Sequence, residues 1–229
     1  MIEDPPLLTL RRTFPRPTPA QVAALTGLPT GFATDAMDGR GALDAAIKPI
    51  DPRARSFCGV ALPCHAGPAD NLAVFGALEA ARAGDVILIA TDGYTATAVI
   101  GDLVLGMARN RGVAAMVTDG CVRDIPGILA VSLPCFAAGV TPNSPARNGP
   151  GTAGLSVVLG GVTVGAGDIV LGDGDGVVVV PFGLIDTVIG RLPAIREAEA
   201  GLDAKVRAGL EIPDFIVDLF AGGRIREVE

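Results

Sequence analysis

Short apolar runs alternate with helix-like segments between residues 57 and 138, and this alternation is the strongest constraint on the fold. The runs cover residues 57–64, 85–90, 113–117 and 134–138. Each has the length of a buried strand. The segments 69–83 and 102–110 between them carry apolar residues at helical spacing, and 69–83 is predicted to be the clearest amphipathic helix. Strands and helices that alternate in this way form an α/β fold.

After Pro142 the pattern changes to short β runs separated by glycines. These runs cover residues 155–159, 162–164, 169–171 and 177–180. They predict antiparallel or mixed sheet. The sequence Asp173-Gly174-Asp175-Gly176 is interpreted as a β-turn, because a calcium-binding EF-hand loop ends in glutamate and is flanked by helices.

Both ends of the chain are expected to lie outside this alternation. Residues 1–17 contain four prolines and are predicted to form an irregular arm, and Thr18-Pro19 is typical of a helix start. A short helix is expected over 31–38, and C-terminal helices over 182–220. No linker interrupts the chain, so we predict a single α/β domain over residues 1–229.

The overall charge and the apolar content exclude several classes of partner. The net charge is −7 and no basic run of five residues occurs, which disfavours nucleic-acid binding. No apolar run approaches the roughly 20 residues that span a bilayer, and the N-terminus lacks a signal-peptide pattern. The four cysteines show no CxxC spacing and are expected to be buried thiols. We predict a soluble cytoplasmic protein with no membrane partner.

Residues 101–145 carry the polar groups best placed for chemistry. Arg123 and Asp124 follow the apolar run 113–117 through a glycine turn, and sites in α/β proteins lie outside the carboxyl ends of strands. Each candidate also has an ordinary interpretation. Asp124 precedes Ile125-Pro126 and is a sound helix cap, Asp102 would favourably open helix 102–110, and Arg123 would form a surface ion pair of little energetic value. The residues alone leave cap and site equally open for Asp124.

The segments 117–124 and 134–142 resemble the family of the regulator of ribonuclease activity A. That family also contains the metal-dependent 4-hydroxy-4-methyl-2-oxoglutarate / 4-carboxy-4-hydroxy-2-oxoadipate aldolases. The aldolase branch is marked by an aspartate, twenty intervening residues and then Arg-Asp, and Asp102 with Arg123-Asp124 has this spacing. The resemblance covers residues 30–200.

The resemblance implies both a fold and an activity. The fold is a swivelling β/β/α domain, with a mixed sheet and flanking helices, assembled as a homotrimer or hexamer. The activity is that of a class II pyruvate aldolase that needs Mg²⁺ or Mn²⁺ and cleaves 4-hydroxy-2-oxo diacids. Oxaloacetate decarboxylation is implied as a side activity, because loss of CO₂ also yields pyruvate enolate. The alternative is a non-catalytic regulator that binds a ribonuclease, which would leave Asp102 unexplained because the family's regulators lack this carboxylate.

The resemblance also assigns roles to individual residues. Asp124 would be the one direct protein ligand of the metal, and Arg123 would stabilise the enolate oxygen. Asp102 would hold the metal-bound water that serves as general acid and base. Backbone amides of Gly101, Asp102, Leu103 and Val104 would bind the pyruvyl carboxylate at a helix N-terminus. The family usually has two leucines where this chain has Leu103-Val104.

Two further residues have weaker functional interpretations. Glu199, or Glu197, loosely matches a glutamate that reaches metal-bound waters of a neighbouring subunit in the aldolases, and a solvated helix face is the simpler interpretation. His65 is the only histidine, which excludes a catalytic triad and a His-rich zinc site. We expect a structural role for it. No GxGxxG or GxxxxGK[ST] motif is present, so no nucleotide cofactor is expected.

Overall fold

The computed structural model describes residues 4–53 and 56–228. Their contacts group them into two compact units, one ending at Gly190 and the other beginning at Arg191. The first unit contains the strands and the candidate site. The second is helical and comprises the later part of α6 (Ile185–Arg207) and α7 (Asp214–Ala221).

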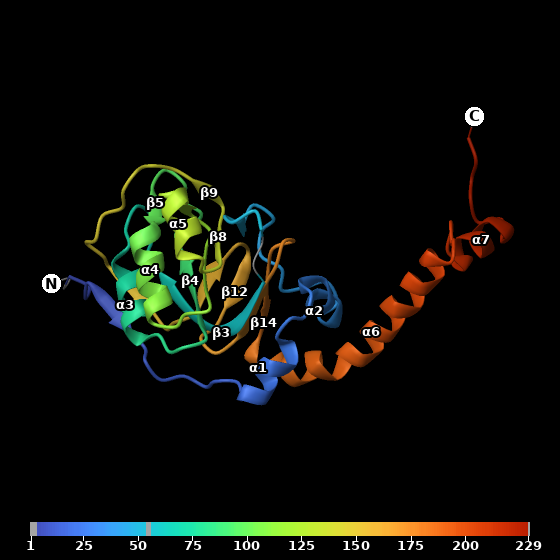
Figure 1. Cartoon of the computed structure of the whole chain (residues 1–229), viewed down its shortest axis with the longest axis horizontal. Coiled ribbons are helices and arrows are strands. Elements are labelled where there is room, and N and C mark those ends of the chain that lie inside the picture. Colours follow the sequence, from blue (N-terminus) through green and yellow to red (C-terminus); the bar gives the residue numbers. More distant parts are fainter. Residues whose placement is uncertain (1–3, 54–55, 229) are drawn as a thin grey trace. The chain divides into compact units, whose positions relative to one another are not determined.

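Four parallel strands with intervening helices form the centre of the first unit. The strands are β3 (Phe57–His65), β4 (Asp85–Ala90), β6 (Ala115–Thr118) and β8 (Cys135–Ala137). They are adjacent in this order, each parallel to the next. The connections contain α3 (Leu72–Ala80), α4 (Asp102–Asn110) and α5 (Ile125–Val131), which gather on one side of the sheet in Figure 1. The predicted α/β alternation is confirmed.

Shorter strands complete a mixed sheet around this centre. They are β1 (Leu8–Leu10), β2 (Lys48–Pro49), β10 (Gly151–Ala153), β13 (Ile169–Gly172) and β14 (Val177–Val180). The order is β1-β10-β3-β4-β6-β8-β2, with β13 also on β3 and β14 on β13. Strands β10 and β13 run antiparallel to β3, as predicted for the C-terminal half. The strands β11 (Val157–Leu159) and β12 (Val162–Val164) form a separate hairpin.

A second, small sheet positions the candidate site. It consists of β5 (Ala98–Ile100), β7 (Cys121–Val122) and β9 (Gly139–Val140), which are parallel. None of these three strands is predicted from the sequence, because two or three residues carry too little periodicity. Their pairing depends on contacts between segments about twenty residues apart.

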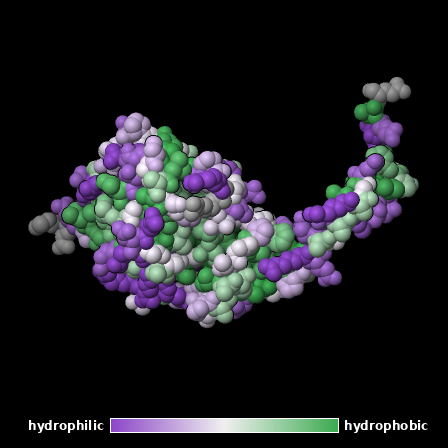
Figure 2. Space-filling model, viewed as in Figure 1, coloured by the Kyte–Doolittle hydropathy of each residue, from purple (hydrophilic) through white to green (hydrophobic). Residues whose placement is uncertain are grey.

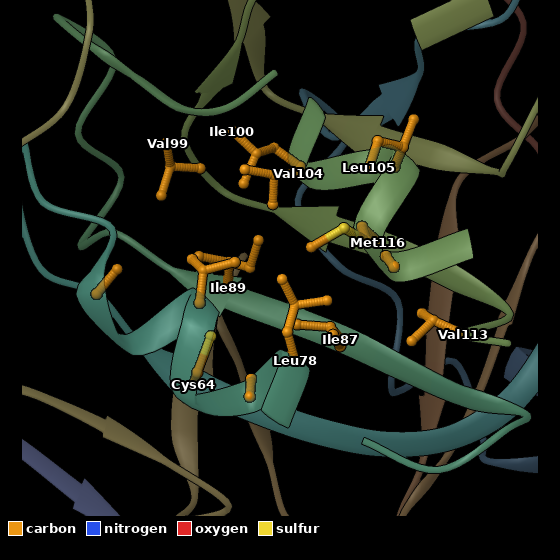
Figure 3. Close-up of a cluster of buried hydrophobic side chains, with 14 of the residues drawn as sticks. Cys64, Leu78, Ile87, Ile89, Val99, Ile100, Val104, Leu105, Val113 and Met116 are labelled. Atoms are coloured by element: carbon orange, nitrogen blue, oxygen red, sulfur yellow. The ribbon is translucent and has the colours of Figure 1, made fainter. Parts of the chain in front are cut away.

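The core lies on both faces of the main sheet, because β4 buries both sets of its alternating side chains. Ile87 and Ile89 face the cluster under α3 and α4, whereas Val86 and Leu88 face the β11–β14 side. Figure 3 shows the first cluster, in which Val104 and Leu105 of α4 lie around Met116 of β6. A strand that is buried on both faces has a continuous apolar sequence, which is why β4 and β6 could be predicted from the sequence.

The N-terminal arm is not irregular throughout, so that prediction is wrong for residues 8–10. Leu8–Leu10 form β1, paired in parallel with β10. A Cβ on Gly76 of α3 would lie 2.7 Å from Leu8 Cδ2, so the missing side chain of Gly76 makes room for Leu8. Proline density in the arm therefore did not prevent a short edge strand, where few backbone donors are needed. Residues 1–3 of the predicted arm lie outside the described residues.

The predicted amphipathic helix over 69–83 is also corrected. Helix α3 covers only Leu72–Ala80, and Glu79 is its one exposed residue. The helix packs against β1, β3 and β10, so nearly its whole circumference is covered. A helix enclosed in this way is apolar on all sides.

The remaining predicted helices and turns are found close to their expected positions. Helix α1 (Pro19–Leu25) begins with a capping box between Thr18 and Gln21, and α2 is Thr30–Ala36. Asp173, in the turn between β13 and β14, accepts hydrogen bonds from the amide and hydroxyl of Thr30. That turn thus holds the start of α2, and its first carboxylate is used for that purpose.

The C-terminal helices are present as predicted, in the form of α6 and α7. Apolar side chains such as Phe215 and Phe220 are exposed there, and Figure 2 shows hydrophobic and hydrophilic residues side by side on these helices. None of the helices in the described part of the chain combines the length and the apolar character that a membrane span needs.

The four cysteines are free thiols, as expected. Cys64, Cys121 and Cys135 are buried and Cys58 is half-buried. Burial raises the pKa of the Cys135 thiol to about 12.

Candidate active site

The small sheet brings the separated parts of the Asp-x20-Arg-Asp motif together. Asp102 follows β5 after Gly101, and Arg123-Asp124 directly follow β7. Strands β5 and β7 are parallel neighbours, so their carboxyl ends meet at one edge. From the sequence, Arg123-Asp124 were predicted to follow the 113–117 strand. In the structure β7 lies between that strand and Arg123, so the site belongs to the small sheet and not to the main one.

These residues line one pocket of about 70 Å³. Its walls are Asn71, Gly101, Asp102, Leu103, Val104, Arg123, Asp124 and Arg147. Every residue predicted to bind substrate or metal directly is therefore in the same pocket. We call Gly101–Val104 with Arg123-Asp124 the motif side, and Asn71 with Arg147 the loop side. Glu199 lies exposed on α6 in the second unit, and its predicted role toward a neighbouring subunit stays a prediction.

Asp124 occupies the N-cap position of α5 but does not act as its side-chain cap. Its carboxylate makes no capping hydrogen bond, and its side chain is 46% exposed. Its backbone is left-handed, with φ 62° and ψ 46°, which is unfavourable for a residue with a side chain. Such strain clusters at functional sites. The cap interpretation, left open by the sequence, therefore loses its main support.

Arg123 is held from three directions at the mouth of the pocket. Its backbone amide donates to the Ile100 carbonyl at 3.1 Å, and its Nε lies 3.2 Å from Asp124 Oδ2. Its Nη1 donates to the hydroxyl of Ser144, in the loop that follows β9. The backbone of Arg123 is thereby fixed to β5, and its guanidinium is oriented by Asp124 and Ser144.

Two glycines provide the space that these side chains occupy. A Cβ on Gly101 would lie 2.6 Å from Asp124 Oδ2 and 3.2 Å from Arg123 Cγ. A Cβ on Gly127 of α5 would overlap the carboxylate of Asp102. Gly101 was predicted to contribute its amide, and this second, steric role was not foreseen. Gly127 was missed entirely, because an isolated glycine in a helical segment carries no signal of what packs against it.

The N-terminus of α4 opens into the pocket. Gly101 is its N-cap and, having no side chain, provides no capping group. Asp102 Oδ1 accepts from the Leu103 amide at 2.7 Å, while the other amides of the first turn have no backbone partner within the helix. Leu103 is 75% exposed and Val104 8% exposed. The departure from two leucines thus replaces an inward-facing leucine with a valine and leaves the backbone donors unaltered.

The carboxylates present suit a cation that keeps much of its water. Asp124 offers an exposed carboxylate, and Asp102 lines the same pocket. Mg²⁺ is commonly held by one or two carboxylates with several waters retained. Within residues 4–53 and 56–228, no group of three or more His, Cys, Asp or Glu side chains is placed to hold a metal, so a fully protein-ligated site is not provided by this part of the chain.

A larger cavity of about 500 Å³ lies elsewhere and is less suited to chemistry. It is lined by Asp44, Asp92 and Asp119 together with mostly small or aliphatic residues. Asp119 accepts hydrogen bonds from Thr91 and the Gly93 amide, and Asp92 lies 3.0 Å from His65 Nε2. These carboxylates hold the turn after β4, and His65 takes part in the same structural contact. Choosing the site by cavity volume alone would therefore select a cavity that does not contain the motif residues.

The family model described as Aldolase/RraA, of the RraA-like group, matches residues 31–179. This chain belongs to the RraA-like family. A relative from Halalkalibacterium halodurans, named "Putative 4-hydroxy-4-methyl-2-oxoglutarate aldolase", is 36% identical over 181 residues. The match covers 79% of this chain and 84% of that protein.

Solved RraA structures share the fold of this family member. The RNA-processing inhibitor RraA from Thermus thermophilis is 29% identical, with a TM-score of 0.61 over 67% of this chain and 92% of that chain. RraAS2 from Streptomyces coelicolor, an unusual member of the RNase ES inhibitor RraA protein family, is 25% identical. Its TM-score is 0.73 over 84% of this chain and 100% of that chain. The predicted RraA-type fold, with mixed sheet and flanking helices, is confirmed.

The loop side of the pocket is the part of this RraA-like site that sequence reasoning missed. Neither Asn71 nor Arg147 was assigned a role from the sequence. Arg147 is separated from the motif by more than twenty residues and stands in an irregular segment after β9. No local pattern connects such a residue with a site formed by other strands.

Proposed function

We propose that this RraA-like protein is a divalent-metal-dependent class II pyruvate aldolase that cleaves 4-hydroxy-2-oxo diacids. The observation that carries the proposal is the pocket in which Asp102, Arg123 and Asp124 meet at the N-terminus of α4. Asp124 does not cap α5 through its side chain, and two glycines make space for the carboxylates. The aldolase name of the bacterial relative supports the same activity.

The α4 N-terminus and Arg123 would bind the 2-oxo-acid end of the substrate. Free amides and the helix dipole favour a carboxylate there. Arg123, oriented by Ser144 and Asp124, would face the 2-oxo oxygen as it gains negative charge. Asp124 would hold Mg²⁺ or Mn²⁺, and the cation would polarise the 2-oxo group when bound. Asp102 would hold the water that takes up and returns protons.

The reaction balances without any redox partner. The proton leaves the 4-hydroxyl, the C3–C4 bond breaks, and its electron pair forms the pyruvate enolate while C4 becomes a carbonyl. Protonation at C3 then yields pyruvate. Oxaloacetate would reach the same enolate by losing CO₂, and so would report on the enolate half of the site alone.

Pyruvate release from oxaloacetate tests the proposal directly. The wild type should turn over with Mg²⁺ or Mn²⁺ and lose activity in excess chelator. Asp124→Ala should reduce metal-dependent turnover by about 10³-fold or more, as expected when a group acting in the transition state is removed. Glu79→Gln, which changes an exposed carboxyl group on α3, should behave like the wild type. Equal turnover of Asp124→Ala and wild type would reject the proposed metal site.

The alternative is a protein that binds and regulates a ribonuclease, in line with the names "RNA-processing inhibitor" and "RNase ES inhibitor RraA protein family" given to the two RraA structures. Asp102 distinguishes the two functions, because by resemblance the regulators lack this carboxylate. Absence of turnover with both metals, together with inhibition of a purified endoribonuclease by the intact chain, would favour the regulator.

A further inference from the structure

The motif side of the pocket accounts for only one end of the proposed substrate. Its groups address the 2-oxo acid, whereas a 4-hydroxy-2-oxo diacid carries a hydroxyl and a second carboxylate at its other end. The remaining pocket walls are Asn71 and Arg147. Their chemistry is that of a hydrogen-bonding amide and a cation, which complements those two substrate groups.

Arg147 carries a charge that no carboxylate among the described residues neutralises through an ion pair. Its guanidinium carbon lies 5.1 Å from the centre of the Phe75 ring, a cation–π contact that restrains the side chain and leaves its N–H donors available. An arginine held in this way presents the planar donor fork that binds a carboxylate through two hydrogen bonds.

The backbone is fixed on both sides of Arg147, after it by a buried aspartate and before it by a main-chain hydrogen bond. Asp70 is 9% exposed, and its Oδ2 accepts from the amides of Asn148 and Gly149 at 2.5 and 3.1 Å. On the other side, the Ala146 amide donates to the Ala69 carbonyl at 2.7 Å. The loop that carries Arg147 is therefore attached to the start of α3 before any ligand arrives, which lowers the entropic cost of binding.

Asn71, which follows Asp70 in the sequence, has one hydrogen-bonding atom without a partner among the described residues. Its Nδ2 donates to the Val99 carbonyl at 3.1 Å, which fixes the orientation of the amide. Its Oδ1 is buried and has no hydrogen-bond partner in the described part of the chain. Buried acceptors are normally paired, so this atom marks a position for a donor such as a hydroxyl.

We infer that the loop side is the subsite for the distal end of the substrate, with Arg147 binding the second carboxylate and Asn71 accepting from the 4-hydroxyl. Asp70 and Phe75 act as positioning residues for Arg147. The inference rests on the proposed function and assigns residues to the distal half of its substrate. It selects diacids over 4-hydroxy-2-oxo acids that end in an uncharged group.

Steady-state kinetics of the intact chain with Mg²⁺ on two matched substrates test this assignment. One is 4-hydroxy-4-methyl-2-oxoglutarate, and the other is 4-hydroxy-2-oxopentanoate, which lacks the distal carboxylate. Arg147→Met should raise KM for the diacid by about tenfold or more, because a charge-assisted hydrogen bond is lost. Its KM for the monoacid should be unchanged, and Arg147→Lys should recover part of the loss. Arg82→Met, at an exposed arginine outside the pocket, serves as the matched control.

Exchange of the pyruvate methyl protons with solvent, followed by NMR, distinguishes failure of the subsite assignment from failure of the aldolase proposal. Exchange that is equal in wild type and Arg147→Met, combined with the selective KM change, supports the subsite. If exchange occurs but KM does not change selectively for the diacid, or if Arg147→Met impairs turnover of both substrates equally, the subsite assignment is wrong and the aldolase proposal still stands. No exchange in the wild type overturns the aldolase and the subsite together.

Discussion

The two sides of the pocket reach their geometry by different routes. On the motif side, Asp102 and Arg123-Asp124 stand directly after two paired parallel strands, and glycines give their side chains room. On the loop side, Arg147 lies in an irregular segment that a buried carboxylate attaches to α3. The difference teaches that one side depends on space beside short strands, whereas the other depends on hydrogen bonds to a distant backbone. Disturbing each side should therefore give a different signature.

Among substitutions that leave the motif and loop-side residues themselves unchanged, Gly101→Ala should give the largest effect and should act on activity alone. The backbone at Gly101 is extended, with φ −137°, and tolerates alanine, but the new Cβ would displace the Asp124 carboxylate. A displacement near 1 Å can cost about 100-fold in rate, and we expect oxaloacetate turnover to fall by that factor. Thermal unfolding should change little.

Gly106→Ala is the matched control on the same helix. The nearest atom to a Cβ at Gly106 is Val131 Cγ2 at 3.9 Å, an ordinary contact. This variant should keep its activity and gain up to about 1 kcal/mol in stability. Full activity in a folded Gly101→Ala variant would remove the steric argument for the motif side.

Gly127→Ala should combine a smaller loss of activity with an unexpected change in stability. Alanine in a helix interior ordinarily stabilises by about 0.5–1 kcal/mol relative to glycine. Here the Cβ would overlap Asp102, so the free energy of unfolding should not rise, and turnover should fall by about tenfold. Chemical denaturation and oxaloacetate turnover measure the two effects. A stabilised and fully active variant would show that Asp102 is not confined by Gly127.

Asp70→Asn, in contrast to the glycine variants, should lower the stability of the protein and raise KM for the diacid. The amide retains only one acceptor oxygen where the carboxylate serves the amides of Leu72, Asn148 and Gly149. The free energy of unfolding should fall by about 1–3 kcal/mol, because buried donors lose their partner. KM for the diacid should rise while pyruvate proton exchange persists.

Asp44→Asn provides the comparison for this variant, since the exposed Asp44 carboxylate accepts a hydrogen bond from the nearby Ala46 amide. We expect a stability change within about 0.5 kcal/mol, as for most surface substitutions. If Asp70→Asn also slowed pyruvate proton exchange, the two sides of the pocket would be coupled. The proposed independence of the loop side from the motif side would then be wrong.

The smallest effect is expected outside the pocket, at Asp168. Burial raises the pKa of its carboxyl group, against the lowering effect of hydrogen bonds from the Gly165 and Phe182 amides. The folded state therefore holds this proton more tightly than the unfolded state. Its contribution to stability is present at pH below the ordinary aspartate pKa and is lost as pH rises through the raised folded-state pKa. Denaturation between pH 3 and 7 should show a shallower loss for Asp168→Asn, and an identical slope would contradict the raised pKa.

The sequence by itself determined the α/β alternation, the antiparallel C-terminal half and the spacing of Asp102 and Arg123-Asp124. These follow from local properties: β4 and β6 bury both faces and read as apolar runs, and the motif has a fixed spacing. The prediction for the arm was wrong at residues 8–10 because β1 forms only through its pairing with β10. The prediction of an amphipathic α3 was wrong because the surrounding strands, and not the helix's own pattern, determine which residues are exposed.

Only the tertiary structure decided which edge of which sheet carries the site and what completes it. Strands β5, β7 and β9 have two or three residues each and form by mutual pairing. The roles of Gly101 and Gly127 depend on side chains that approach from other elements, and Arg147 joins the pocket through the carboxylate of Asp70. Contacts between residues far apart in the chain leave no periodic trace in the sequence, because each partner obeys its own local pattern.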